Sequence, residues 1–478
     1  MSGLSRRRRA LVVALGASLV LGCRALGGEE SSAPPNFVLL MTDDQGWGEL
    51  GARGHSSLRT PHLDRLAGDG LVFERFYAAH PTCSPTRASF LTGRHPNRTG
   101  TFSWGHELPG SERTLAEELT RAGYATGHFG KWHVGSVRPE DATSPGAQGF
   151  ETWASAPNFF DLDPLLSVEG TVVEHRGEGS DVVTERALAF IERSVADRRP
   201  FLAVVWYGNP HLPHVATEDD LASLGHLPEE ERAYAAELEA IDRSVGTLRA
   251  GLRALGVEDR TLVWFTSDNG PRPPAPFDEE ATAGLRGRKG SLWEGGVRVP
   301  ALVVWPEVVE AGRRTSVVAS TSDLLPTVLE LAGVELPPVP LDGVSQVPAL
   351  HGREVPRPRG LGFWALPTGG RVMHARKMLE LMRAGERSPE EQPPVVQPDL
   401  LRGEPRGAAA WIDGDLKLHA DREEGGLRYR LYDLAVDPGE SRDLAAERTA
   451  TVARLASDLA AWRQEVARDW LARHAPSD

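Results

Sequence analysis

The chain has 478 residues, of which 40% are hydrophobic and 25% are charged. This balance is typical of globular proteins and excludes a disordered chain or a multi-span membrane protein, and the length allows more than one domain. The net charge of −14 excludes a general affinity for nucleic acid, because phosphate backbones are bound by basic surfaces. We therefore expect a globular protein with no nucleic-acid partner.

The N-terminus has the pattern of an export signal. Four arginines at positions 6–9 precede an apolar stretch at 10–21, which is too short to span a bilayer as a mature helix. We predict a signal peptide over residues 1–22. It ends in Val-Leu-Gly-Cys23, which resembles the lipobox of bacterial lipoproteins and predicts a lipid anchor at Cys23. An ordinary signal peptide with an incidental cysteine is the alternative.

On the lipoprotein interpretation, the protein is exported to the bacterial periplasm or cell envelope and tethered to a membrane, with residues 23–35 as a polar linker. The sequence contains only two cysteines. If Cys23 carries lipid, Cys83 has no partner for a disulfide, although an oxidising compartment favours disulfides. The lone thiol of Cys83 therefore calls for a chemical explanation.

Three apolar runs predict buried strands. They are apolar throughout rather than alternating, which is typical of parallel strands covered on both faces. Helical patterns lie between them, so strands and helices alternate along the chain. This arrangement predicts an α/β fold with a large, mostly parallel but mixed central sheet sandwiched by helices. The runs are Phe37–Met41, Phe201–Trp206 and Leu262–Phe265.

Two of the intervening helices have clear signals. Thr114 with Glu117 predicts a capping box at a helix start, and Gly123 predicts where that helix ends. Apolar residues recur at alternating three- and four-residue spacing from Leu238 to Leu255. This spacing predicts a helix with a core-facing stripe, to which we assign no function.

The composition changes near residue 335, where prolines become frequent. We expect a first domain over residues 36–350 and a smaller C-terminal α+β subdomain over 351–478. Residues 366–408 are rich in Pro, Arg and Glu and predict an insertion. The subdomain is expected to contain a short antiparallel sheet followed by a helix. Its strand-like segments are Ala410–Ile412, Leu416–His419 and Tyr429–Tyr432, and its helical pattern runs from Val452 to Val466.

Oxygen-bearing side chains follow two of the predicted strands. Asp43 and Asp44 come after the first strand, and Asp268 and Asn269 come after the third. Ligands of open α/β sheets bind beyond the carboxyl ends of the strands. Three carboxylates and an amide there would suit Ca²⁺ or Mg²⁺ rather than zinc, because no Cys or His belongs to the set. The alternative is that these residues only form loops.

Cys83 begins the segment Cys-Ser-Pro-Thr-Arg-Ala-Ser-Phe-Leu-Thr, which predicts a turn running into a helix with Pro85 in the first turn. Cys83 would then lie at a helix N-terminus, where free N–H groups and the helix dipole favour an anion. Arg87, one turn further, can face the same place. The alternative is a buried structural cysteine.

The run CSPTRASFLTGR matches the Cys-x-Pro-x-Arg signature of the sulfatases, within the alkaline-phosphatase-like superfamily. The blocks Gly130-Lys-Trp-His-Val-Gly135 and Leu285-Arg-Gly-Arg-Lys-Gly-Ser-Leu-Trp-Glu-Gly-Gly296 agree, as do the segments NFVLLMTDDQGWGELG and LYDLAVDPGE. The resemblance covers residues 36 to about 465, with the blocks in the family's order. The chain is identified as a member of this family, and its pattern is similar to arylsulfatase A and N-acetylgalactosamine-6-sulfatase.

The resemblance implies a sulfuric ester hydrolase whose catalytic domain is residues 36–350. Cys83 would be oxidised to formylglycine by a formylglycine-generating maturation enzyme, and the aldehyde hydrate would be the nucleophile. Ca²⁺, with Mg²⁺ as the less favoured choice, would be held by residue 83 and by the residues that match the family's ligands. These are Asp43, Asp44, Asp268 and Asn269.

The same resemblance assigns the remaining catalytic residues. Arg87 matches the residue that steadies the formylglycine. Lys131, Lys289 and a protonated His211 would stabilise the charge that builds on the sulfate ester, and His211 or Lys289 would donate a proton to the leaving alcohol. His133 would deprotonate the second hydroxyl of the hydrate and so release sulfate.

One position departs from the family pattern. Some relatives place a sulfate-binding serine shortly after a Gly-Phe pair. Counted from Gly149-Phe150, that position is Phe159, next to Asn158. The sulfate contact is therefore either lost or supplied by Asn158.

Two other functions compete with a sulfatase. Phosphonate monoester hydrolases of the same superfamily also use formylglycine, but the Gly-Lys-Trp-His and Trp-Glu-Gly-Gly blocks favour a sulfatase. A catalytically inactive surface-binding lipoprotein would show substituted ligand positions, whereas every expected position is filled. The substrate would be a sulfated glycan or an aryl sulfate. We expect its specificity to lie on loops near residues 98–108, 157–180, 212–230 and 365–408.

Overall fold

The computed structural model describes residues 33–273, 277–355, 357–392, 401, 406–424 and 426–474. The predicted signal peptide, Cys23 and most of the linker lie outside these residues. The chain from Pro35 to Asp478 forms one compact unit. Among the described helices, none has the length and hydropathy needed to cross a membrane.

Ten strands of the described chain form the central sheet, in the order β10-β2-β9-β8-β1-β7-β3-β4-β5-β6. Neighbours from β8 to β4 pair in parallel, whereas β9 pairs antiparallel with β2 and β8, and β5 pairs antiparallel with β4 and β6. The strands are β1 (Asn36–Thr42), β2 (Leu71–Tyr77), β3 (Ala125–Lys131), β4 (Thr152–Ala156), β5 (Leu165–Val168), β6 (Thr171–Glu174), β7 (Phe201–Trp206), β8 (Thr261–Ser267), β9 (Ala301–Val304) and β10 (Arg313–Ser320).

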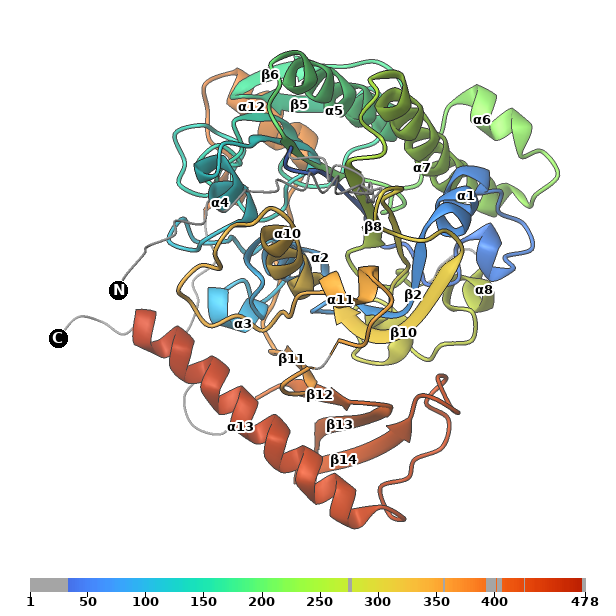
Figure 1. The fold of residues 1–478 in the computed structure, drawn as a ribbon, viewed down its shortest axis with the longest axis vertical. Helices are drawn as coiled ribbons and strands as arrows, with labels where there is room; N and C mark the ends of the chain where they lie inside the picture. The colour runs from blue at the N-terminus through green and yellow to red at the C-terminus, as the bar shows by residue number, and fades with distance from the viewer. Residues whose placement is uncertain are drawn as a thin grey trace, which may run out of the picture. The chain divides into compact units, whose positions relative to one another are not determined.

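The three strands predicted from apolar runs are β1, β7 and β8, and every residue in them is buried. Helices cover both faces of the sheet because parallel strands expose apolar side chains on each side. α1, α5 and α7 pack together on one face, and α2, α4 and α10 gather on the other (Figure 1). The larger helices are α1 (Pro61–Asp69), α2 (Cys83–Thr92), α4 (Leu115–Arg121), α5 (Gly179–Ala196), α7 (Glu229–Ala254) and α10 (Leu324–Leu331). This confirms the predicted mixed α/β class.

The predicted helix signals are confirmed. The capping box of α4 has Thr114 accepting from the Glu117 amide while the Glu117 carboxylate accepts from the Thr114 amide. The stripe that begins at Leu238 lies on the buried face of α7. The short helical segments are η1 (Gly51–Arg53), α3 (Pro96–Thr99), α6 (Glu218–Ser223), α8 (Asp278–Thr282), α9 (Glu294–Val297), η2 (Thr321–Asp323), α11 (Val347–Leu350) and η3 (Pro389–Glu391).

A second, antiparallel sheet has the order β11-β12-β13-β14, and the long helix α13 lies along it (Figure 1). This is the predicted α+β arrangement, to which the structure adds β11. The boundary predicted at residue 350 stays a prediction. Much of the predicted insertion is described, and it contains the helix α12, whereas residues 393–400 and 402–405 lie outside the described chain. The bounds are β11 (Leu361–Ala365), α12 (Ala375–Arg383), β12 (Ala408–Asp413), β13 (Leu416–Glu423), β14 (Gly426–Asp433) and α13 (Thr449–His474).

Candidate active site

Four neighbouring parallel strands bring the predicted site residues to one edge of the sheet. In the order β8-β1-β7-β3, their carboxyl ends point the same way, so residues distant in sequence meet there. Asp43 follows β1 directly, Asp268 follows β8, and Lys131 is the last residue of β3. The register pairs Thr42 with Ser267, which places the carboxylates of Asp43 and Asp268 side by side.

Cys83 is the first residue of α2, as predicted, and it is buried. Its Sγ lies 3.5 Å from Asp43 Oδ1 and 3.2 Å from Lys289 Nζ. Burial, followed by the charge of Asp268, raises the pKa of the Cys83 thiol to about 12. A thiol with that pKa remains protonated and is a poor nucleophile at neutral pH. The environment therefore does not support thiolate catalysis by an unmodified cysteine.

The oxygens around Cys83 form a group with the chemistry of a hard-cation site. One ligand atom each from Asp43, Asp44, Cys83 and Asp268 lies within 4.8 Å of the others. Two buried oxygens at this place, Asp44 Oδ2 and Asn269 Oδ1, accept no hydrogen bond among the described residues. Carboxylate and amide oxygens are the ligands that Ca²⁺ and Mg²⁺ prefer. This donor set fits the divalent metal that the family uses.

Two lysine side chains face these carboxylates. Lys131 Nζ lies 2.5 Å from Asp43 Oδ2, and Lys289 Nζ lies 2.5 Å from Asp44 Oδ1. Burial is the largest influence and raises the pKa of each carboxyl, but the nearby lysine and His211, with Arg87 at Asp43, together outweigh it, so the pKa values of Asp43 and Asp44 lie below normal. For Asp268, burial and repulsion by Asp43 prevail and its pKa is raised. The three carboxyl groups of Asp43, Asp44 and Asp268 can therefore accommodate further positive charge.

The Gly-Lys-Trp-His block owes its shape to one glycine. Gly130 has φ of 109°, and a Cβ there would lie 1.9 Å from the Trp206 carbonyl oxygen. Only glycine allows β3 to approach β7 so closely and present Lys131 at the strand end. His133 follows with φ of 56°, a left-handed conformation that costs a non-glycine residue about 1–2 kcal/mol.

The two predicted catalytic histidines lie near these cations, with His133 buried and His211 partly buried. Neither ring nitrogen of His133 has a hydrogen-bond partner among the described residues, and burial followed by the charge of Lys131 lowers its pKa well below normal. His133 is therefore neutral and able to accept a proton. Burial also lowers the pKa of His211, although Asp43 and Asp44 oppose the shift. The protonated state that we expect of His211 therefore stays a prediction.

At the position where some relatives have a sulfate-binding serine, this chain has Phe159, which makes an aromatic contact. The ring of Phe159 stacks on His211, with centroids 4.5 Å apart. Asn158 donates a hydrogen bond from Nδ2 to the Met373 carbonyl oxygen at 2.8 Å. This hydrogen bond holds the segment that leads into α12, and both outcomes left open by the sequence stay predictions.

A buried charged group that sequence reasoning missed supports the block containing Lys289. Glu294 accepts hydrogen bonds from Lys417 Nζ at 2.8 Å and from the Tyr77 hydroxyl at 3.0 Å. Glu440 accepts from His419 Nε2 and from the Glu294 amide, each at 2.6 Å. Glu294 and Glu440 both stand inside the recognised sequence blocks. For Glu294, the sequence feature that could have indicated this group was a glutamate placed among glycine and apolar residues.

Comparisons with known proteins agree with this site. The sulfatase family model matches residues 35–334, and the chain therefore belongs to the sulfatase family. It is 37% identical to human arylsulfatase A, over 72% of this chain and 71% of that protein. It is 36% identical to pig N-acetylgalactosamine-6-sulfatase, over 71% and 70% of the two chains.

The fold is also similar to the crystal structure of Ps i-CgsB in complex with k-i-k-neocarrahexaose. The TM-score is 0.74 at 25% identity, and the match covers 93% of this chain and 98% of that one. The protein is a sulfuric ester hydrolase. This family uses formylglycine and a divalent metal.

Proposed function

We propose that this sulfatase acts through formylglycine made from Cys83 and through Ca²⁺ held by Asp43, Asp44, Asp268 and Asn269, together with residue 83 itself. The observation that supports this most directly is the placement of Cys83. Its buried Sγ lies within 4.8 Å of oxygens from three carboxylates in a surrounding that suppresses the thiolate. Mg²⁺ is the less favoured ion, because a buried set of four oxygen-bearing side chains suits the larger, more flexibly coordinated Ca²⁺.

The chain's own residues would position and stabilise the sulfate ester. The modified residue supplies a hydroxyl that can attack sulfur, and the cation supplies positive charge next to the sulfate oxygens. Lys131 and Lys289 place ammonium groups on two sides of this location, and either Lys289 or His211 can donate a proton to the leaving alcohol. His133, whose ring nitrogens have no hydrogen-bond partner among the described residues, can take a proton from the hydroxyl at position 83.

The experiment that tests this proposal is mass spectrometry of the peptide that contains residue 83. Protein produced with a formylglycine-generating enzyme should be lighter there by about 18 Da and should react with a hydrazide probe, whereas protein produced without that enzyme should retain the thiol. A Cys83→Ala variant should lose at least about 10³-fold in sulfate release. A fully active enzyme with an unmodified Cys83 would refute the proposal.

For the substrate, we propose a sulfated glycan or an aryl sulfate. The relatives include arylsulfatase A, and Ps i-CgsB was crystallised with an oligosaccharide. Release of inorganic sulfate from a panel of sulfated saccharides and from 4-nitrocatechol sulfate tests this assignment. Release of methylphosphonate from its phenyl ester, with no sulfate released from any member of the panel, would instead indicate a phosphonate monoester hydrolase.

We also propose that the protein is exported to the bacterial periplasm or cell envelope and anchored by lipid at Cys23. The support is the sequence of residues 1–23 alone. A Cys23→Ser variant should move from the membrane fraction to the soluble fraction while its sulfate release remains unchanged. A mature wild-type chain whose Cys23 carries no lipid would reduce the proposal to ordinary secretion.

A further inference from the structure

A cavity of about 390 Å³ lies between the loop that follows β4 and the helix α12. This volume is within the range of small-molecule sites, which is about 300–1,000 Å³. Its apolar lining includes Phe159, Phe160 and Leu162, and its charged lining includes Asp161, Arg376 and Lys377. We call this space the α12 cavity.

The α12 cavity begins next to the active site. Phe159 lines the cavity and also stacks on His211, whose Nε2 lies 3.8 Å from Asp44 Oδ2. Asp161 is near enough to His214 for each to shift the pKa of the other, so the loop that carries His211 runs past the cavity. A molecule bound by its sulfate ester at residue 83 can therefore extend over Phe159 into this space.

Helix α12 is held in place although it belongs to the insertion between β11 and β12. It packs against β5 and β6. Its N-terminal approach is fixed by the hydrogen bond from Asn158 to the Met373 carbonyl oxygen. The segment after it is fixed by Arg138, which pairs with Glu391 at 2.7 Å. The wall formed by α12 is thus part of the folded enzyme rather than a freely moving excursion.

The charged groups on this wall retain capacity to bind a ligand. Arg376 lies 3.6 Å from Glu174, and Lys377 lies 4.0 Å from Glu390, distances beyond that of a good hydrogen bond. Their side chains are 54% and 63% exposed. Together with the carboxylate of Asp161 they offer donors and an acceptor beside apolar and aromatic surface. A sugar ring needs this combination, because it has hydroxyl groups at its edge and C–H groups on its faces.

We propose that the α12 cavity binds the sugar residue next to the sulfated one, so that the substrate is a sulfated oligosaccharide or polysaccharide rather than a small aryl sulfate. This inference rests on the proposed function. Arg376 and Lys377 donate hydrogen bonds to hydroxyl or acidic groups of the neighbouring sugar, and Asp161 accepts from its hydroxyls. The insertion at 366–408 then has the role of selecting the length of the substrate.

The test compares matched substrates for the wild-type enzyme and three single variants. Each sulfated monosaccharide of a panel is paired with a di- or tetrasaccharide that contains it, and 4-nitrocatechol sulfate is included as a substrate too small to reach the cavity. The variants are Arg376→Ala, Lys377→Ala and the control Arg383→Ala, which removes an exposed cation from the last turn of the same helix.

The wild-type enzyme should prefer an oligosaccharide to its monosaccharide. In Arg376→Ala and Lys377→Ala, the ratio of kcat/KM for the oligosaccharide to that for 4-nitrocatechol sulfate should fall about tenfold, as expected for loss of a charged hydrogen bond. Arg383→Ala should keep the wild-type ratio. An unchanged ratio in the first two variants, or hydrolysis of aryl sulfates alone, would overturn this inference and leave the proposed function intact. Absence of sulfate release from every substrate would overturn both.

Discussion

Arg87 shows how a single side chain organises the centre of the site. Its Nε and Nη2 donate to Asp268 Oδ2 at 3.2 and 2.7 Å, and its Nη1 donates to the Lys131 carbonyl oxygen at 2.9 Å. The guanidinium also lies 5.0 Å from the ring centroid of Trp206. The side chain is fully buried, so its charge depends on these partners. A planar group with several fixed donors is required to make all of these contacts together.

Replacing Arg87 should therefore affect stability as well as turnover. We expect Arg87→Ala to lower the free energy of unfolding by about 3–5 kcal/mol, because Asp268 loses a buried partner. Arg87→Lys retains the charge but loses the paired donors, and should recover only part of that free energy. Urea denaturation measures the change in stability, and the rate of sulfate release divided by the fraction of residue 83 converted to the aldehyde measures the change in turnover. Equal stability of Arg87→Lys and wild type would contradict this role.

Asp268 is the residue for which we expect metal binding and catalysis to fail together. In the wild type, the backbone amide of Asp44 donates to Asp268 Oδ1 at 3.1 Å. The Asp268→Asn variant keeps an oxygen that can accept this hydrogen bond but removes a negative charge from the cation site. The affinity for Ca²⁺ should fall at least about tenfold. Elemental analysis and calorimetric titration with Ca²⁺ measure this loss. Stoichiometric zinc in active wild-type enzyme would contradict the oxygen-ligand assignment.

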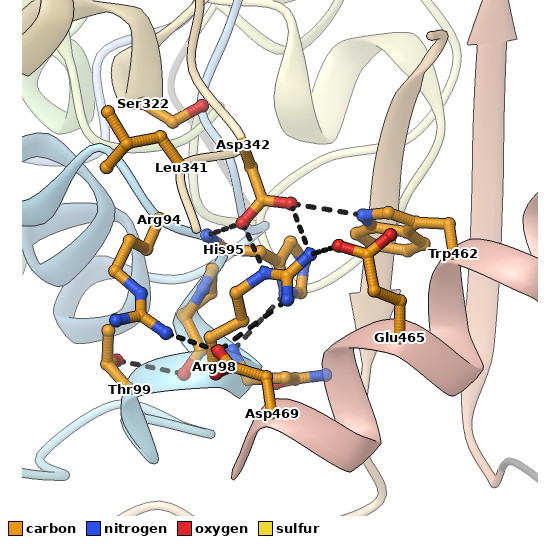
Figure 2. A network of polar contacts seen from close by, with 12 residues as sticks. Arg94, His95, Arg98, Thr99, Ser322, Leu341, Asp342, Trp462, Glu465 and Asp469 are labelled. Carbon is orange, nitrogen blue, oxygen red and sulfur yellow. Dashed lines mark hydrogen bonds and ion pairs between the residues drawn. The ribbon is translucent and has the colours of Figure 1, made fainter. Parts of the chain in front are cut away.

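At the scale of elements, a polar network joins α13 to the catalytic part of the chain. Figure 2 shows the Arg98 guanidinium between Asp342 and Glu465, to which it donates at 2.8 and 2.6 Å. Trp462 donates from its indole nitrogen to Asp342 at 3.2 Å, and Arg94 pairs with Asp469. Helix α13 is therefore fastened to α3, and to the loop that follows α10, by buried charge as well as by its apolar face.

The charge of Asp342 should make this attachment sensitive to acid. Burial raises the pKa of the Asp342 carboxyl, but Arg98 outweighs burial and holds it below the ordinary value of 3.8. A carboxyl with a lowered pKa stabilises the fold above its unfolded-state pKa, and this contribution is lost as the pH falls through the lowered value. Asp342→Asn should thus cost about 3 kcal/mol at neutral pH.

The same substitution should flatten the dependence of stability on pH below about pH 4. Urea midpoints of wild type and Asp342→Asn, measured at neutral and acidic pH, test both effects. Glu335→Gln is a suitable control, because Glu335 is exposed in the same connection after α10. If Asp342→Asn and Glu335→Gln had the same stability at neutral pH, the network would not contribute as described.

At the scale of the whole molecule, the small sheet supports the large one through buried ions. Lys417 of β13 lies between Glu294 and Glu440, with its Nζ 2.8 and 3.2 Å from their carboxylates. His419 of the same strand stacks on Trp293, with centroids 4.1 Å apart. Because Glu294 lies near the end of the sequence block that carries Lys289, the C-terminal sheet fixes the far part of an active-site segment.

We expect Glu440→Gln to weaken both the fold and the reaction. The variant leaves Lys417 with one buried carboxylate instead of two and should cost about 3 kcal/mol. A less firmly held Lys289 should also lower kcat for 4-nitrocatechol sulfate. Glu447→Gln, at an exposed position after β14, is the matched control. Thermal unfolding and steady-state kinetics give the two readouts, and an unchanged kcat in a destabilised Glu440→Gln would limit the network to a structural role.

The sequence alone determined the features that depend on neighbouring residues. Buried parallel strands have continuous apolar runs, so β1, β7 and β8 could be predicted from the sequence. The capping-box pattern likewise predicted where α4 begins. The sulfatase blocks identified the residues of the site because each block carries its chemistry over a few positions. The other strands of the central sheet, β2, β3, β4, β5, β6, β9 and β10, were not predicted, since their burial depends on which strands lie beside them.

Only the tertiary structure decided which separated segments meet. Asn269 donates to Asp44 across 225 positions of sequence, and the sheet order alone accounts for that proximity. The α12 cavity combines a loop after β4 with a helix more than two hundred residues later. Both lie in segments on which we expected substrate specificity, but no pattern in either segment indicates that the two meet. Contacts of this kind arise from packing between elements, whose free energy depends on three-dimensional fit rather than on local spacing.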